Sequence, residues 1–212
     1  KALAQEFYPG VLLPETMFNG DTLNYALKRV STLEIAGLRA LVIWSLLRKR
    51  CLEHFRLQGK YYPVAIDGTG ALVFRSKHCD HCLRKTSNGK TTYYHPVLEA
   101  KLALENGLAL SVGTEFIENE RPDVEKQDCE LKAFYRLVKT LKSDFPQTQL
   151  CLLLDGLFAC APVLKICRDN RWAYIITLKE GRLPAASQDY EALLKLTPEN
   201  TRVDSRENCR RT

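Results

Sequence analysis

Residues 61–70 read Tyr61-Tyr62-Pro63-Val64-Ala65-Ile66-Asp67-Gly68-Thr69-Gly70, an apolar run that ends at an acidic side chain. A second run, residues 150–156, has the same construction and ends in Asp155-Gly156. Both runs are short, continuously apolar and bounded by polar or turn residues. They therefore predict strands that are covered on both faces, with a carboxylate where the backbone leaves the sheet.

Two such strands lying side by side would bring Asp67 and Asp155 together. Neighbouring carboxylates disfavour each other's ionisation unless a cation lies between them, and oxygen ligands suit Mg²⁺ or Mn²⁺. For either residue alone, capping a turn is an equally good interpretation. The pair favours a metal site.

The composition indicates a globular protein. The chain has 212 residues, 45% of them hydrophobic, and a net charge of +6. This length allows one sizeable domain, or one domain with a helical appendage. The basic excess fits a polyanionic partner but also many ordinary soluble proteins. Eight cysteines without a regular framework favour a reducing cytoplasm. The longest apolar run, residues 40–47, is far shorter than the roughly 20 residues of a membrane span, so we expect no membrane partner.

Residues 1–59 predict a small helical region that serves in DNA binding or assembly. Asp21 offers an N-cap, and Ser31 with Glu34 has the spacing of a capping box that opens a second helix, to about residue 57. The far end of that helix is basic, with Arg48, Lys49 and Arg50. A solvated helix face is the favoured interpretation of this charge, and contact with DNA phosphates is the alternative.

From residue 60 the pattern changes to strands. We expect them at residues 62–74, 93–104, 108–117, 150–155 and 172–178, with a hairpin turn at Asn106-Gly107. An acidic stretch at 115–130 precedes an amphipathic helix, and a short helix follows at 159–168. This order predicts an α/β fold, a mixed five-stranded sheet flanked by helices, in which the strands of Asp67 and Asp155 are adjacent and parallel.

A loop between the first two strands carries four potential zinc ligands, His78, Cys79, His81 and Cys82. Cys-x-x-Cys is half of a zinc knuckle, but one tight loop cannot easily surround a tetrahedral ion. A metal-free loop is therefore favoured, with structural Zn²⁺ and a redox dithiol as alternatives. Basic residues in and after this loop suit phosphate contacts; they are Lys77, Arg84, Lys85 and Lys90.

The order of elements, with Asp67 on the first strand and Asp155 after the fourth, resembles a ribonuclease-H-like catalytic domain. More narrowly, four segments resemble a DDE-type transposase of bacterial insertion sequences, of the kind that forms DNA hairpins. They are residues 65–69, 93–101, 113–117 and 153–158, and the likeness spans about residues 60–185.

The resemblance implies DNA transposition and recombination by a nuclease that uses a two-ion Mg²⁺ or Mn²⁺ centre. Asp67 would bridge the ions and Asp155 would hold one of them. Double-stranded DNA would be the partner, with a dimer assembled on it. For His95, on the second strand, a packed or surface position is favoured over a place in this centre.

The family takes its third carboxylate from a Tyr-x-x-Arg-x-x-x-Glu-x-x-x-x-x-x-Lys pattern, which residues 156–212 lack. None of Glu180, Glu191, Glu199 and Glu207 is assigned that role. We therefore expect a transposase fragment that stops before the catalytic Glu, whose residues 1–212 bind DNA without cutting it in magnesium. A non-catalytic DNA-binding remnant and another ribonuclease-H-like nuclease are the alternatives.

Overall fold

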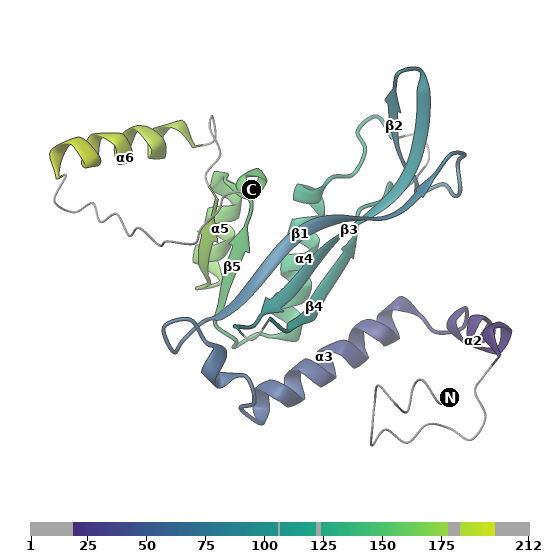
Figure 1. The fold of residues 1–212 in the computed structure, drawn as a ribbon, viewed down its shortest axis with the longest axis horizontal. Coiled ribbons are helices and arrows are strands. Elements are labelled where there is room, and N and C mark those ends of the chain that lie inside the picture. Colours follow the sequence, from purple (N-terminus) through teal and green to yellow (C-terminus); the bar gives the residue numbers. More distant parts are fainter. Residues whose placement is uncertain (1–18, 106, 122–123, 178–182, 198–212) are drawn as a thin grey trace.

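A mixed β-sheet organises the molecule (Figure 1). The computed structural model describes residues 19–105, 107–121, 124–177 and 183–197. Within them the sheet has six strands, in the order β2-β3-β1-β5-β6, and β4 also pairs with β3. Their bounds are β1 Tyr62–Phe74, β2 Leu83–Ser87, β3 Lys90–Ala103, β4 Ala109–Phe116, β5 Leu150–Leu154 and β6 Ala173–Ile176.

The predicted α/β class and the mixed sheet flanked by helices are confirmed, and the topology is compatible with a ribonuclease-H-like fold. β1 pairs antiparallel with β3 and parallel with β5, while β5 pairs parallel with β6. The strands that lead to Asp67 and Asp155 are therefore adjacent and parallel, as expected. β5 is almost fully buried, and β1 is mostly buried from Tyr62 to Ile66, whereas Leu72 and Val73 farther along β1 are exposed.

The sheet contains one strand more than the five expected. β2 pairs antiparallel with the first residues of β3 through a two-residue turn at Asn88-Gly89. Both turn residues have positive φ, 50° and 70°, as a hairpin turn of the primed type requires. β2 and β4 therefore lie one after the other along the same edge of β3, and the β2–β3 hairpin projects from the sheet (Figure 1).

Helix α4 (Glu130–Asp144) packs against β3 and β4 through its apolar face. Its buried side chains are Ala133, Phe134, Leu137, Val138 and Leu141. The approach is close at Gly113 of β4, where an added Cβ would lie 2.6 Å from a methyl carbon of Leu137. The shorter helix α5 (Ala161–Asp169) lies between β5 and β6 in the chain and buries Val163 and Cys167.

The described part of the N-terminal region, from residue 19, is helical, as predicted. Helix α2 (Gly20–Leu27) is capped by Asn19 rather than by Asp21, because the Asn19 side chain accepts a hydrogen bond from the Asp21 amide. Ser31 and Glu34 form the expected capping box at the start of α3 (Thr32–Arg48). α3 ends earlier than predicted: Arg50 has a φ of 58°, and a short 3-10 helix, η1 (Glu53–Phe55), follows.

Helix α3 contacts the sheet at β4 and buries Ile43. In the described part of the chain, no single helix is long and apolar enough to cross a membrane. Helices α2 and α3 together reach that length and composition, but they meet at an angle of 92°. The last described helix, α6 (Pro184–Leu196), has no buried residue.

Candidate functional site

Asp67 lies on β1, and Asp155 directly follows the neighbouring strand β5 at the matching position. The parallel register of β1 and β5 runs from Tyr62↔Leu150 to Ala65↔Leu153, and two further residues on each strand lead to the two aspartates. Adjacent strands are about 4.8 Å apart. Pairing with β5 stops at Ala65, whereas β1 continues along β3 to Phe74. The edge of β1 that faces β5 is therefore no longer paired with β5 at Asp67.

The two carboxylates differ in their surroundings. Asp67 is exposed, and its Oδ1 accepts a hydrogen bond from the Gly68 amide at 2.9 Å. Asp155 is half-buried, and its Oδ1 accepts a hydrogen bond from the Leu157 amide at 2.9 Å, which caps the 3-10 helix η2 (Gly156–Phe158). The turn-capping interpretation therefore holds for Asp155, and the cap also fixes the orientation of its carboxylate.

Glu130, the first residue of α4, brings a third carboxylate to this place. Its side chain lies directly over Gly68, where a Cβ would collide with the carboxylate. Burial raises the pKa of Glu130, and the charges of Asp67 and Asp155 raise it further. Three acidic groups from two strands and one helix therefore act on one another electrostatically.

Aromatic packing joins the two elements that carry Asp155 and Glu130, namely η2 and α4. Phe158 in η2 and Phe134 in α4 are both fully buried, and their ring centroids are 5.2 Å apart. Because η2 starts directly after Asp155 and α4 starts at Glu130, this contact fixes the spacing of the two backbones. The sequence contains both phenylalanines, but their meeting depends on tertiary packing.

Two other acidic residues of the stretch at 115–130 are engaged elsewhere. Arg136 of α4 forms ion pairs with Glu115 and Asp128 and donates a hydrogen bond to the Phe116 carbonyl at 2.9 Å. The pKa of Arg136 is raised, first by the hydrogen bond to Asp128 and then by the charges of both carboxylates. Partial burial opposes this shift without cancelling it. The stretch is thereby tied to α4, while Glu130 reaches the aspartates.

The three carboxylates suit divalent ions but do not surround a single ion position. In the described ranges, only Cys79, Cys82 and His95 bring three ligand atoms within 4.8 Å of one another. A two-ion centre spreads its carboxylates around ions about 3.5–4 Å apart, so it does not require such convergence. Oxygen ligands of this kind favour Mg²⁺ or Mn²⁺.

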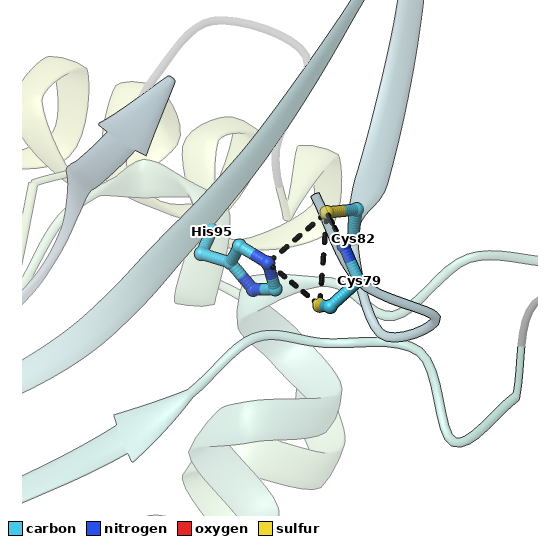
Figure 2. A group of neighbouring side chains, drawn as sticks. All are labelled: Cys79, Cys82 and His95. Carbon is cyan, nitrogen blue, oxygen red and sulfur yellow. Dashed lines mark hydrogen bonds between the residues drawn. The ribbon is translucent and has the colours of Figure 1, made fainter. Parts of the chain in front are cut away.

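The two thiols of the Cys-x-x-Cys loop lie beside His95 of β3 (Figure 2). The two histidines of the loop itself are not part of this group. Cys79 and Cys82 contact His95, while His78 stacks on Phe74 with ring centroids 4.3 Å apart. The Nδ1 atom of His81 bonds to the Asn119 carbonyl at 2.7 Å. The predicted quartet is therefore divided, and His95 lies in this cluster instead.

The predicted basic residues form two separate groups. Lys77, Arg84, Lys85 and Lys90 lie on or beside the β2–β3 hairpin, whereas Arg48, Lys49 and Arg50 surround the C-terminal end of α3, at the opposite end of the molecule (Figure 1). All seven are exposed. Lys77 pairs with Asp80 at 2.7 Å, Arg50 lies 3.8 Å from Glu53, and Arg48 lies over the Trp44 ring.

Of the four glutamates without an assigned role, the structure describes one. Glu191 is exposed on α6, and Glu180, Glu199 and Glu207 lie outside the described residues. No protein-family model matches the sequence, and no curated protein matches it significantly.

Proposed function

We propose that this protein is a DNA transposase of the DDE type, which cleaves phosphodiester bonds at insertion-sequence ends and transfers the strands. The observation that carries this proposal is the juxtaposition of Asp67 and Asp155 on adjacent parallel strands, with Glu130 at the start of the helix above. A sheet that ends in two carboxylates of different strands is an arrangement suited to oxygen-binding cations.

Asp67 and Asp155 would hold Mg²⁺ or Mn²⁺, and Glu130 would be the third acidic ligand. Two bound ions activate the attacking oxygen and stabilise the leaving oxygen of an in-line displacement. The protein's own contribution is to orient the carboxylates: the Leu157 amide fixes Asp155, and the Gly68 amide fixes Asp67. The raised pKa of Glu130 fits a group whose preferred neighbour is a cation.

Glu130 changes what we expect of residues 1–212. Inactivity was expected from the sequence because two carboxylates hold a second ion poorly. With a third carboxylate inside the chain, we propose that these residues bind the ions themselves. The β2–β3 hairpin, with Arg84, Lys85 and Lys90 exposed, is the surface that we propose for duplex DNA.

The test combines Mn²⁺ binding, followed by electron paramagnetic resonance, with nicking of supercoiled plasmid in Mn²⁺. We expect the wild-type protein to bind and nick, Asp67→Asn and Asp155→Asn to lose both, and Glu130→Gln to bind Mn²⁺ more weakly. Asn can still accept the capping hydrogen bond at position 155, so that variant keeps the turn. Glu191→Gln on α6 is the matched control and should behave as wild type.

Wild-type protein without Mn²⁺ affinity would overturn the proposed metal centre. Binding of DNA and Mn²⁺ without nicking would favour the second candidate, a DNA-binding remnant that keeps the fold. Nicking of RNA in preference to DNA would favour another nuclease of the same fold.

A further inference from the structure

We infer that Cys79, Cys82 and His95 form a zinc site that pins the loop after β1 to β3. The inference rests on this cluster alone and is independent of the proposed transposase activity. The two thiols come from the loop between β1 and β2, and the imidazole comes from β3 (Figure 2). All three side chains are half-buried or buried.

The distances match those of zinc ligands. Cys79 Sγ and Cys82 Sγ are 3.7 Å apart, and His95 Nε2 lies 3.2 Å from the first and 3.1 Å from the second. Tetrahedral coordination, with Zn–S near 2.3 Å and Zn–N near 2.0 Å, places two sulfurs about 3.8 Å apart and sulfur and nitrogen about 3.5 Å apart. The sulfur pair already has this spacing, and the imidazole needs to withdraw by only a few tenths of an ångström.

The surroundings favour thiolates and a correctly oriented imidazole. The Cys79 amide donates a hydrogen bond to Cys82 Sγ at 3.4 Å. Glu118 Oε2 lies 4.0 Å from His95 Nδ1, on the ring edge opposite Nε2. A carboxylate that hydrogen-bonds the other ring nitrogen of a ligating histidine is a common outer-shell partner of zinc, and Glu118 needs to approach by about 1 Å to form that bond.

The neighbouring histidines are not needed for this site. His78 stacks on Phe74, and His81 is held by Asn119. We therefore assign three protein ligands, with water at the fourth position. Thiolate and imidazole ligands together select Zn²⁺ over Mg²⁺ or Mn²⁺. Each thiol releases its proton when the ion binds.

The cluster lies where two strands meet end to end along β3. β2 pairs with β3 up to Tyr94, and β4 pairs with β3 from Val97 onward, so His95 lies at the gap between them. An ion at this gap would hold the β1–β2 loop to β3, at the base of the projecting hairpin.

The first experiment measures zinc in protein purified without chelator, and Co²⁺ binding by its visible spectrum. We expect about one zinc per chain, as for other sites of this kind, lost in Cys79→Ser and in His95→Ala. Cys51→Ser and His78→Ala are matched controls and should retain the metal. Glu118→Gln should weaken zinc affinity by about tenfold, the lower end of outer-shell effects.

Failure of the wild-type protein to bind an equimolar amount of added Zn²⁺ would overturn the inference. So would zinc that survives His95→Ala but is lost in His81→Ala, because the ligands would then come from the loop alone. Hydrogen exchange provides a second readout that needs no variant. Stripping zinc should speed amide exchange in residues 78–95 and leave exchange in α4 unchanged. Equal exchange rates in residues 78–95 with and without zinc would contradict the role in holding the hairpin.

Discussion

Glu130 shows how a single side chain acquires a role from its position in the fold. It starts a helix, where an acidic residue is favoured by the helix dipole, and the sequence offers no further sign of function. Packing of α4 places its carboxylate over Gly68 and beside two aspartates. The aspartates could be predicted because each ends an apolar strand, whereas Glu130 could not, because its approach depends on contacts between distant segments.

The raised pKa of Glu130 predicts a pH dependence of stability. Since its folded pKa lies above its unfolded value, the folded state binds this proton more tightly, and stability is lost as pH rises through the folded pKa. Glu130→Gln should therefore unfold at higher urea concentration than wild type at pH 7, in the absence of divalent ions. The difference should shrink below the unfolded pKa of Glu, about 4.3.

Urea unfolding at several pH values checks this expectation, with Glu191→Gln as the control. Added Mn²⁺ should reverse the order at pH 7, because a cation stabilises the ionised carboxylate and not the amide. A variant that is less stable than wild type at pH 7 without metal would contradict the prediction.

At the scale of elements, the loop that carries Cys82 is held in place by one buried residue, Asn119. Its Nδ2 donates a hydrogen bond to the Cys82 carbonyl and its Oδ1 accepts one from the Asp128 amide, both at 3.1 Å. The Asn119 backbone bonds twice to His81. These four hydrogen bonds position the loop that we propose to bind zinc.

Asn119→Ala should destabilise the protein by about 2–3 kcal/mol, because one buried and one partly buried backbone group lose their partners. Urea unfolding measures the change, and Asn24→Ala on the exposed helix α2 is the control that should stay within about 0.5 kcal/mol of wild type. An equal, small effect of both substitutions would show that water replaces the Asn119 side chain.

Most elements could be predicted from hydrophobic pattern and capping residues. β5, α4 and the capping box of α3 lie where expected, because local periodicity and local hydrogen bonds determine them. β2 was overlooked although Asn88-Gly89 is as good a hairpin signal as Asn106-Gly107. Its strand is mostly polar, with one buried residue, so no apolar alternation marks it. The ligand role inferred for His95 was hidden for a related reason: pairing along β3, not sequence proximity, brings it to the cysteines.

At the scale of the whole molecule, the two basic groups lie at opposite ends of the structure (Figure 1). Arg48 and Arg50 already contact Trp44 and Glu53, respectively. Arg84, Lys85 and Lys90 form none of the ion pairs seen in the described part of the chain. The hairpin therefore offers the charges that are most available to phosphates.

Neutralising the hairpin charges should reduce the salt dependence of DNA binding. For the triple variant Arg84→Gln, Lys85→Gln, Lys90→Gln, the slope of log K against log salt should fall by about 2–3, close to one per lost phosphate contact. The variant Arg48→Gln, Lys49→Gln, Arg50→Gln removes the same charge and is the matched control. Fluorescence anisotropy with a labelled duplex measures both slopes, and an equal fall in the two variants would assign the contacts to overall charge.

The outer edge of β2 has one further consequence. Gln127 accepts a hydrogen bond from the Arg84 amide and donates one to the Arg84 carbonyl, so its side chain occupies the edge as an added strand would. An open strand edge is a template on which other chains assemble into aggregates. Gln127 therefore occupies the backbone groups of Arg84 that an incoming strand would need, and it protects this part of the edge from pairing with another chain.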